Sequence, residues 1–459
     1  MRNKALIWLY ILMTTPFAMA NVTLPSFFLD NMVLQRNTIV SIWGWGNPNE
    51  EITLTTGWDQ KEYKVKTGNQ ANWKVSFATP EAGGPHTIAI KGYNEIVLKN
   101  ILIGEVWLCS GQSNMEMSAS WGIKDGEQET AAATDSNIRF FTVAKHSATT
   151  PQDNLLGAWE PCSPETMKHF SAVGYYFAKR LRKELKNVPI GLICSAWGGT
   201  PAEIWMPEHV VQSDPLLREA AQKINPEQWG PEQPGRAFNA MIHPLVGFCM
   251  AGVLWYQGER NVGASNYDKT LAALIASWRQ QWKQDFPFYI VQIAPFNYGN
   301  NGEAAAVIRE AQRKVAMGVG NSGLVVTSDV ATVDDIHPKD KKPVGERLAG
   351  LALKNTYNIE TGVVNGPTFR EIKIEKDKVA VYFDNSEGLY VKDKMPTQFE
   401  IAGVDNIFYA ADAKIKNKAV WLHSDKVKQP VKVRYGWSNT ALASLFNGAG
   451  LPASTFSSE

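Results

Sequence analysis

One apolar stretch constrains the fold of this chain more than any other feature of the sequence. Residues 101–109 are mostly apolar and have the length of a buried strand. The run ends abruptly in Ser-Gly-Gln-Ser-Asn-Met at 110–115. Gly111 permits a sharp turn, and Ser113 then stands where a chain leaving a sheet begins a helix. A serine there can face the ligand-binding edge of a parallel sheet, or it can serve only as a helix N-cap.

From residue 101 to about 360, apolar runs alternate with helical patterns, which is typical of a parallel α/β sheet. The expected strands are 101–109, 188–196, 247–256, 287–294 and 323–329. The expected helices are 172–186, 266–284, 303–317 and 342–356. Two excursions rich in Pro, Gly and Trp, 120–168 and 206–240, are expected to overhang the carboxyl edge of the sheet.

Short alternating runs separated by turn residues flank this central part. They predict a small β-sandwich of Ig-like size at 21–100 and a second β-sandwich at 361–459. The predicted organisation is therefore a catalytic domain at 101–360 between two β domains. The apolar tail at 445–453 is expected to dock on the body of the protein.

The first 20 residues have the pattern of a secretory signal peptide. Arg2 and Lys4 precede a short apolar run, which ends at Ala18-Met19-Ala20. The run is too short for a membrane span, so we expect an exported, periplasmic or extracellular protein without a span in the mature chain. The 46 basic and 45 acidic residues nearly balance, which gives no indication of nucleic acid or an anionic membrane as partner.

The four cysteines have no metal-binding spacing. Three of them, Cys109, Cys194 and Cys249, fall in or at the end of apolar runs, where cysteine usually acts as a small buried hydrophobe. An exported protein can form disulfides, but the sequence alone does not establish one. We expect no structural metal and no cofactor. The 16 tryptophans suit either sugar stacking or, more commonly, a buried core.

Two further stretches end predicted strands with polar or flexible residues. Gly198 and Gly199 follow the second strand, and a glycine backbone can donate its N–H to a ligand or simply form a tight turn. Gln257 follows the third strand and offers a side-chain donor at the same edge. Because a developing oxyanion needs such donors, these residues and the Ser113 backbone are candidates for an oxyanion hole.

His337 follows the last predicted strand. Of the seven histidines, it alone has two carboxylates, Asp334 and Asp335, among the three residues before it. A histidine is the usual base for a serine hydroxyl, and a carboxylate fixes its tautomer. Neighbouring residues in an extended loop point in opposite directions, so only one aspartate should reach the ring. A turn would return Asp334 to the histidine, and we therefore prefer Asp334 over the alternative Asp335.

Four motifs together resemble the sialate O-acetylesterase family of the SGNH hydrolases. They are Gly-Gln-Ser-Asn-Met at 111–115, Trp-Gly-Gly-Thr-Pro-Ala-Glu at 197–203, Trp-Tyr-Gln-Gly-Glu at 255–259 and Asp-Ile-His-Pro at 335–338. The resemblance covers nearly the whole chain after residue 22. It implies a flavodoxin-like hydrolase domain, Ser113 as nucleophile and His337 as base. It also implies an oxyanion hole formed by Ser113, the Gly198-Gly199 turn and Gln257, which replaces the asparagine of the wider SGNH pattern.

The same resemblance leaves the carboxylate open. SGNH enzymes usually place it three residues before the histidine, at Asp334, whereas this branch more often has the adjacent Asp-Ile-His of Asp335. The motifs also supply candidates for substrate binding: Glu203, Trp205, Glu259 and Arg260.

The resulting functional hypothesis is an exported carbohydrate O-acetylesterase that works through an acyl-enzyme. By resemblance, the first substrate is a 9-O-acetylated sialic acid, and acetylated xylan or another plant glycan is the alternative. A glycan-binding protein with a vestigial hydrolase site is a hypothesis of another class, which the complete Ser, Gly, Gln and His set argues against. A thioesterase or lipase is weaker, because no apolar lid-like segment lies near the motifs.

Overall fold

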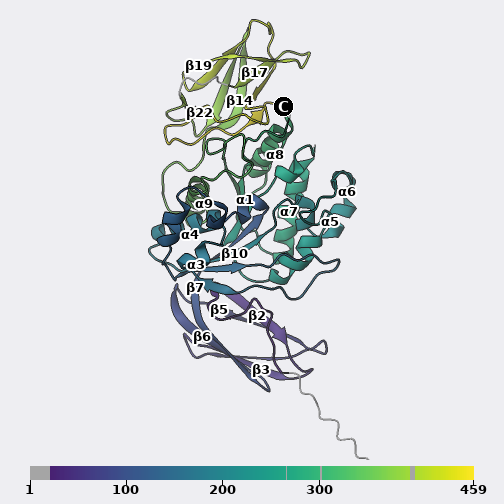
Figure 1. The fold of residues 1–459 in the computed structure, drawn as a ribbon, viewed down its shortest axis with the longest axis vertical. Coiled ribbons are helices and arrows are strands. Elements are labelled where there is room, and N and C mark those ends of the chain that lie inside the picture. The colour runs from purple at the N-terminus through teal and green to yellow at the C-terminus, as the bar shows by residue number, and fades with distance from the viewer. Residues whose placement is uncertain (1–20, 265, 300–301, 393–397) are drawn as a thin grey trace, which may run out of the picture.

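The computed structural model describes residues 21–264, 266–299, 302–392 and 398–459. Figure 1 shows three tiers along the longest axis of the molecule. Strands from the N-terminal part lie at one end, a mixed α/β body lies in the middle, and strands from the C-terminal part lie at the other end. The predicted signal peptide at 1–20 lies outside the described residues.

A largely parallel sheet forms the middle of the body. Its order is β13-β12-β11-β7-β10-β8-β9, and only the edge strand β9 runs antiparallel to its neighbour. Strands β10 and β11 are buried at every position, because helices cover both faces of the sheet. The bounds are β13 Ser322–Val325, β12 Phe288–Val291, β11 Gly252–Tyr256, β7 Glu95–Gly111, β10 Ile190–Ala196, β8 Ile138–Thr142 and β9 Trp159–Pro161.

Two pairs of helices cover the sheet. Helices α4 (Ala172–Glu184) and α9 (Lys342–Asn355) pack together, and their apolar residues share one core cluster. Helices α7 (Tyr267–Trp282) and α8 (Ala304–Gly318) pack together and contribute to the other cluster. The five predicted strands and four predicted helices of this part are all present, so the mixed α/β prediction is confirmed. Strands β8 and β9 lie within 120–168, where the sequence analysis expected only an overhanging excursion.

Strand β7 is long and belongs to two regions of the molecule. Its first half pairs with β6 (Gly83–Lys91) and β1 (Val33–Gln35), and its second half pairs with β10 and β11. The expected boundary between residues 100 and 101 therefore falls inside a single strand. The other strands of the N-terminal region are β2 Ile39–Trp45, β3 Glu51–Thr56, β4 Glu62–Lys66 and β5 Asn72–Ala78.

The C-terminal region contains two four-stranded sheets, β14-β15-β20-β19 and β18-β17-β21-β23, which enclose an apolar cluster. Arg309 of α8 fastens this region to the body, since its guanidinium donates to the Thr455 side chain and to the Ser438 carbonyl. The bounds are β14 Thr368–Glu375, β15 Lys378–Asp384, β16 Tyr390–Val391, β17 Phe399–Ala402, β18 Phe408–Ala410, β19 Asp412–Lys416, β20 Ala419–His423, β21 Lys432–Tyr435, β22 Leu445–Phe446 and β23 Phe456–Ser457.

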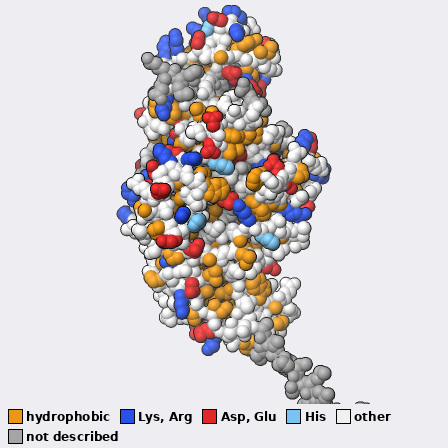
Figure 2. Space-filling view, in the orientation of Figure 1, with side chains coloured by type: hydrophobic (Ala, Val, Ile, Leu, Met, Phe, Trp, Pro, Cys, Tyr) orange, Lys and Arg blue, Asp and Glu red, His pale blue; other side chains and the backbone are white. Residues whose placement is uncertain are grey.

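Short helices occupy the connections of the body. They are α1 Ser113–Glu116, η1 Ala119–Trp121, α2 Gly126–Ala131, α3 Pro164–Met167, η2 Ala202–Trp205, α5 Glu208–Ser213, α6 Pro215–Gln222, η3 Phe238–Ile242, η4 His243–Leu245 and η5 Glu259–Asn261. All four cysteines are free thiols. On the face seen in Figure 2, acidic and basic side chains are interspersed, as expected from the balanced composition.

Candidate active site

Ser113 and His337 meet at the carboxyl edge of the central sheet. Ser113 begins α1 directly after β7, and His337 lies in the loop between β13 and α9. The Oγ of Ser113 lies 2.8 Å from Nε2 of His337, a distance suited to proton transfer. Gly111 makes the sharp turn before the serine: its φ is +133°, and a Cβ there would lie 2.2 Å from the Tyr256 carbonyl oxygen. The structure thus brings together the predicted serine and histidine.

The environment of His337 favours its neutral form. Burial lowers the pKa of its imidazole below the ordinary value, and the positive charge of Lys341 lowers this pKa further. The negative charges of Asp335 and Glu116 act in the opposite direction. A neutral imidazole is the form that can accept a proton from a hydroxyl.

The two aspartates before His337 have different surroundings. The Asp335 Oδ1 accepts a hydrogen bond from the backbone N–H of His337, with an N···O distance of 2.8 Å. Asp334 is exposed, and its carboxylate has no hydrogen bond or ion pair to any described residue. Neither carboxylate has a hydrogen bond to the imidazole ring among those of the described chain, so the choice between Asp334 and the alternative, Asp335, stays a prediction, and the backbone contact favours Asp335. An aspartate side chain readily bonds to the backbone two residues on, which the alternation argument did not consider.

The glycine turn after β10 lies beside Ser113, but one of its two N–H groups is occupied. The Gly198 N–H donates to the Glu116 Oε2 at 2.9 Å, and the same carboxylate is 2.5 Å from the Lys145 Nζ. The backbone N–H groups of Gly199 and Ser113 have no hydrogen-bond acceptor among the described residues. These two groups therefore remain available to a ligand.

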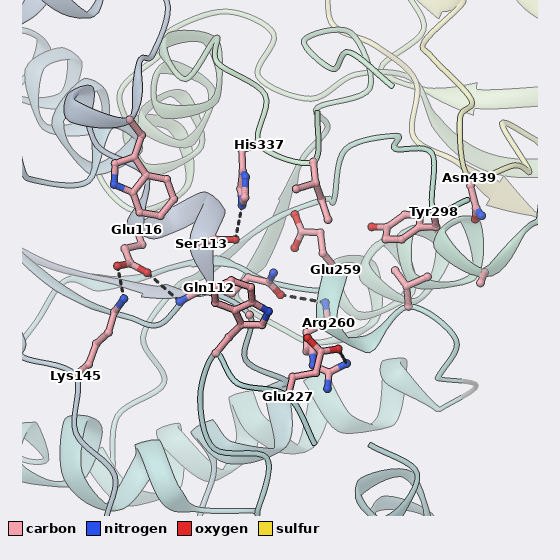
Figure 3. A pocket seen from close by; sticks show the side chains of 17 residues that line it. Gln112, Ser113, Glu116, Lys145, Glu227, Glu259, Arg260, Tyr298, His337 and Asn439 are labelled. Carbon is pink, nitrogen blue, oxygen red and sulfur yellow. Dashed lines mark hydrogen bonds and ion pairs between the residues drawn. The ribbon is translucent and has the colours of Figure 1, made fainter. Parts of the chain in front are cut away.

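A cavity of about 760 Å³ opens above the serine and the histidine. In Figure 3, Glu116 and Lys145 lie to one side of Ser113, and Glu259 and Tyr298 lie to the other. Two tryptophans with large exposed fractions line it, Trp121 at 45% and Trp229 at 60%. Asn439 of the C-terminal region also lines this cavity, so that region forms part of its wall.

Comparisons with known proteins identify the family of this chain. Residues 103–354 match the family model described as "Carbohydrate esterase, sialic acid-specific acetylesterase". The chain belongs to this family. Sialate O-acetylesterases from Homo sapiens and Rattus norvegicus are each 28% identical to it, over 82% of this chain and 79% and 81% of their own lengths. A carbohydrate acetylesterase from Xanthomonas citri superposes with a TM-score of 0.87 at 37% identity, over 96% of this chain and 100% of that chain.

Membership of the sialic acid-specific acetylesterase family makes the chain a carboxylic ester hydrolase. The expected resemblance is therefore confirmed at the level of family and enzyme class.

Gln257 does not face the cavity, contrary to the oxyanion role expected from the family resemblance. Its side chain is fully buried, and its Nε2 donates to the Asn261 Oδ1 at 2.8 Å and to the Thr200 carbonyl at 3.2 Å. The Tyr267 hydroxyl donates to its Oε1 at 2.7 Å. Because both amide hydrogens are already used, Gln257 cannot donate to an oxyanion unless this network breaks.

Gln112 is the glutamine that lines the cavity, beside Ser113 (Figure 3). Its Oε1 accepts hydrogen bonds from the backbone N–H groups of Gly258 and Arg260, both at 3.3 Å. This fixes the orientation of the amide, and its Nε2 has no acceptor among the described side chains and backbone. Gln112 belongs to the serine motif, but no feature of the sequence marks it as a hydrogen-bond donor to a ligand.

The four candidates for substrate binding separate into two pairs. Glu259 and Arg260 line the cavity, and Arg260 pairs with Glu227 at 3.0 Å. Glu203 and Trp205 are 1% and 0% exposed and are not among the residues that line the cavity. The structure corrects these two assignments: Glu203 accepts hydrogen bonds from Asn261, and Trp205 packs in the core against Trp255.

Asn114, next to the serine, connects two buried charged groups that the sequence analysis missed or left unplaced. Its Nδ2 donates to the Glu259 Oε1 at 2.6 Å, and its Oδ1 accepts from the Lys341 Nζ at 2.6 Å. Burial raises the pKa of Glu259 and lowers the pKa of Lys341 to about 7. In the sequence, only the position of Lys341 four residues after His337 could have suggested that it lies near the site. That spacing gives no indication that the lysine is buried.

Within the described ranges, no cluster of three or more His, Cys, Asp or Glu is placed to hold a metal ion. Likewise, no helix of the described chain is long and apolar enough to cross a membrane.

Proposed function

We propose that this chain is a serine O-acetylesterase that removes acetyl groups from carbohydrates. The observation that carries the proposal is the 2.8 Å contact between the Ser113 Oγ and the His337 Nε2 at the base of the cavity. A serine hydroxyl becomes a useful nucleophile only when such a base can take its proton.

In the proposed mechanism, the Ser113 Oγ attacks the acetyl carbonyl carbon while His337 takes the hydroxyl proton. The tetrahedral intermediate collapses, the ester C–O bond breaks, and His337 returns the proton to the departing sugar oxygen. Water, deprotonated by His337, then attacks the acetyl-serine and releases acetate. Asp335 holds the loop of His337 through its backbone and stabilises the imidazolium that forms in each step.

The proposed oxyanion hole consists of the backbone N–H groups of Ser113 and Gly199 and the side-chain N–H of Gln112. All three belong to residues that line the cavity, and none has a protein acceptor among the described residues. Preorganised donors of this kind stabilise charge that develops in the transition state.

Two exposed tryptophans support carbohydrate as the substrate class. Trp121 and Trp229 both line the cavity, and Trp121 lies edge-to-face with His337 at 5.9 Å between ring centroids. Large aromatic faces left in water at a cavity rim are suited to stacking on the apolar face of a sugar ring. The names of the relatives favour an O-acetylated sialic acid, most simply the 9-O-acetyl ester.

A neutral acetylated glycan, such as acetylated xylan, is the second candidate, and a specific observation favours it. The two basic side chains that line the cavity, Lys145 and Arg260, are both paired, with Glu116 and Glu227. A sialate carboxylate bound here would have to compete for one of these cations, whereas a neutral sugar would not.

The finer assignments of architecture and location belong to the same proposal. We infer that the body, 101–360, is an SGNH hydrolase domain of flavodoxin-like arrangement between two β-sandwich domains, 21–100 and 361–459. We also infer that residues 1–20 direct export to the periplasm or the cell exterior. The motif set and the basic, apolar and small-residue pattern of the N-terminus support these inferences.

The experiment compares wild type with Ser113→Ala. Wild type should release acetate from 4-nitrophenyl acetate and from at least one member of a panel of O-acetylated sialic acids and xylooligosaccharides. Ser113→Ala should lose about 10⁴-fold or more in kcat while keeping its circular dichroism spectrum and Tm. Near-wild-type turnover by folded Ser113→Ala would falsify the nucleophile assignment, and the panel ranks the sialate against the neutral glycan.

A further inference from the structure

Three residues that line the cavity, Glu259, Arg260 and Tyr298, each carry a buried polar atom without a partner in the described chain. Two of these atoms, the Oε2 of Glu259 and the hydroxyl of Tyr298, belong to side chains that lie next to one another in Figure 3. Glu259 is only 7% exposed, and it lies at the start of η5, after β11. Tyr298 lies in the loop between β12 and α8. Both residues line the same cavity as Ser113.

These atoms face one another next to the nucleophile. In Figure 3 the Tyr298 side chain points toward the Glu259 carboxylate, which lies between Tyr298 and the Ser113–His337 pair. The charge of Glu259 raises the pKa of Tyr298, in addition to the larger effect of burial. The other oxygen of Glu259 is held at 2.6 Å by Asn114, the residue after the serine. The free Oε2 is therefore fixed in orientation.

Leaving such atoms without partners is unfavourable. Buried polar groups in proteins are nearly always hydrogen-bonded, and an orphaned one calls for a ligand, a water molecule or a functional reason. The carboxylate can only accept, whereas the phenol can donate and accept. Two neighbouring hydroxyl groups would satisfy both atoms together. A carboxylate group would be repelled by Glu259, so this part of the cavity suits an uncharged, hydroxylated portion of the ligand.

We propose that Glu259 Oε2 and the Tyr298 hydroxyl form a subsite for adjacent free hydroxyls of the acetylated sugar. The acetyl group then lies over Ser113, and the hydroxyls fix the ring beside it. This inference rests on the proposed function and deepens it, because it makes these two residues the determinants that favour sugar esters over simple acetyl esters.

The test measures binding, so that it does not depend on turnover. Ser113→Ala protein keeps an acetylated sugar intact, and its Kd for the best sugar of the panel is compared with that of Ser113→Ala/Tyr298→Phe. Loss of one neutral hydrogen bond should weaken binding about 3- to 10-fold. A second ligand, the same sugar with the hydroxyl next to the ester replaced by hydrogen, completes a double-mutant cycle. The deoxy sugar should bind both proteins equally weakly.

Tyr93→Phe is the matched control, since Tyr93 is 59% exposed in the N-terminal region and should leave binding unchanged. Tyr298→Phe should keep or raise Tm, because it removes a buried hydroxyl that has no protein partner. Glu259→Gln in the same background should weaken sugar binding about 10-fold or more, since charged acceptors bond more strongly.

Equal Kd values of the two proteins for the sugar would overturn the subsite. An equal loss of affinity in both proteins on removal of the sugar hydroxyl would overturn it as well. Failure of wild type to hydrolyse any acetyl ester would contradict the proposed function alone, since the Kd cycle still reports on the subsite.

Discussion

The Glu116 carboxylate accepts a hydrogen bond from the Gly198 backbone N–H at 2.9 Å, on the side of the cavity next to Ser113. Lys145 binds the same carboxylate and so holds it in place. One of the two glycine N–H groups expected to receive an oxyanion is thus already occupied by an anion. In the proposed mechanism, stabilisation of the tetrahedral intermediate then depends on Ser113, Gly199 and Gln112.

We expect Gln112→Ala to lower kcat by about 10²–10³-fold with little change in KM, the usual effect of removing one oxyanion donor. Steady-state kinetics on 4-nitrophenyl acetate will measure this. An increase in KM alone would make Gln112 a residue that binds the ground state instead.

Gln257→Ala should act on stability rather than on the transition state. It removes three buried hydrogen bonds of the amide, to the Tyr267 hydroxyl, the Asn261 Oδ1 and the Thr200 carbonyl, each of which contributes about 0.5–1.5 kcal/mol to stability. Urea unfolding at fixed pH should show the loss as a lower midpoint. A fully stable Gln257→Ala protein with a 10²-fold lower kcat would restore the oxyanion role to this residue.

For the aspartate pair, we expect Asp335→Asn to be far more damaging than Asp334→Asn. Asp335 contacts the His337 backbone and stabilises its imidazolium, whereas Asp334 is exposed. The change at Asp335 should lower kcat by about 10²-fold or more, with the 10⁴-fold loss in a serine-protease triad as an upper guide. Asp334→Asn serves as the matched control and should stay within about 2-fold of wild type. The reverse order would return the role to Asp334.

The pH profile of kcat/KM should fall on the acid side at a pH below about 6.5, the ordinary pKa of histidine. Burial and Lys341 lower the pKa of His337, so the ring stays neutral until the pH drops below that value, and activity is then lost by protonation. Lys341→Met removes one of these causes and should move the acid limb to higher pH. An unmoved limb would show that Lys341 does not act on the histidine.

Lys341 should also make stability depend on pH. Burial lowers its pKa to about 7, whereas the unfolded chain keeps the ordinary value near 10.4. Between these values the unfolded state binds the extra proton, so the free energy of unfolding should rise with pH. Methionine does not titrate, so wild type should gain stability relative to Lys341→Met as the pH is raised from 7 to 9 in urea titrations. Parallel pH dependences of the two proteins would contradict a lowered pKa in the folded state.

The sequence predicts the body of the fold well, because buried parallel strands are apolar on both faces. The runs at 190–196 and 252–256 are buried at every position. Strand β8 was missed because its five residues lie in a stretch rich in turn residues, and its place beside β10 follows from tertiary pairing.

The sequence also indicates which loops meet, but not which atoms face the cavity. The serine and histidine motifs identified a pair that the structure places 2.8 Å apart. The choice between Gln112 and Gln257 depends on side-chain direction, and Gly258, with φ of +155°, turns the chain immediately after Gln257. No pattern in the sequence carries that information. Tyr298 belongs to none of the four motifs, so the sequence did not mark it as a site residue.

The length of strand β7 limits how the sequence of such a chain can change in evolution. Its 17 residues form one rod, roughly 55 Å long, that carries N-terminal strands at one end and Ser113 just beyond the other. Replacing the N-terminal strands by those of another gene would have to preserve the register of pairs such as Leu102 with Val33. A slip by one residue would reverse the facing of every side chain along the strand. We therefore expect an exchange of sequence near residue 100 to disturb both regions, because that point falls inside one strand.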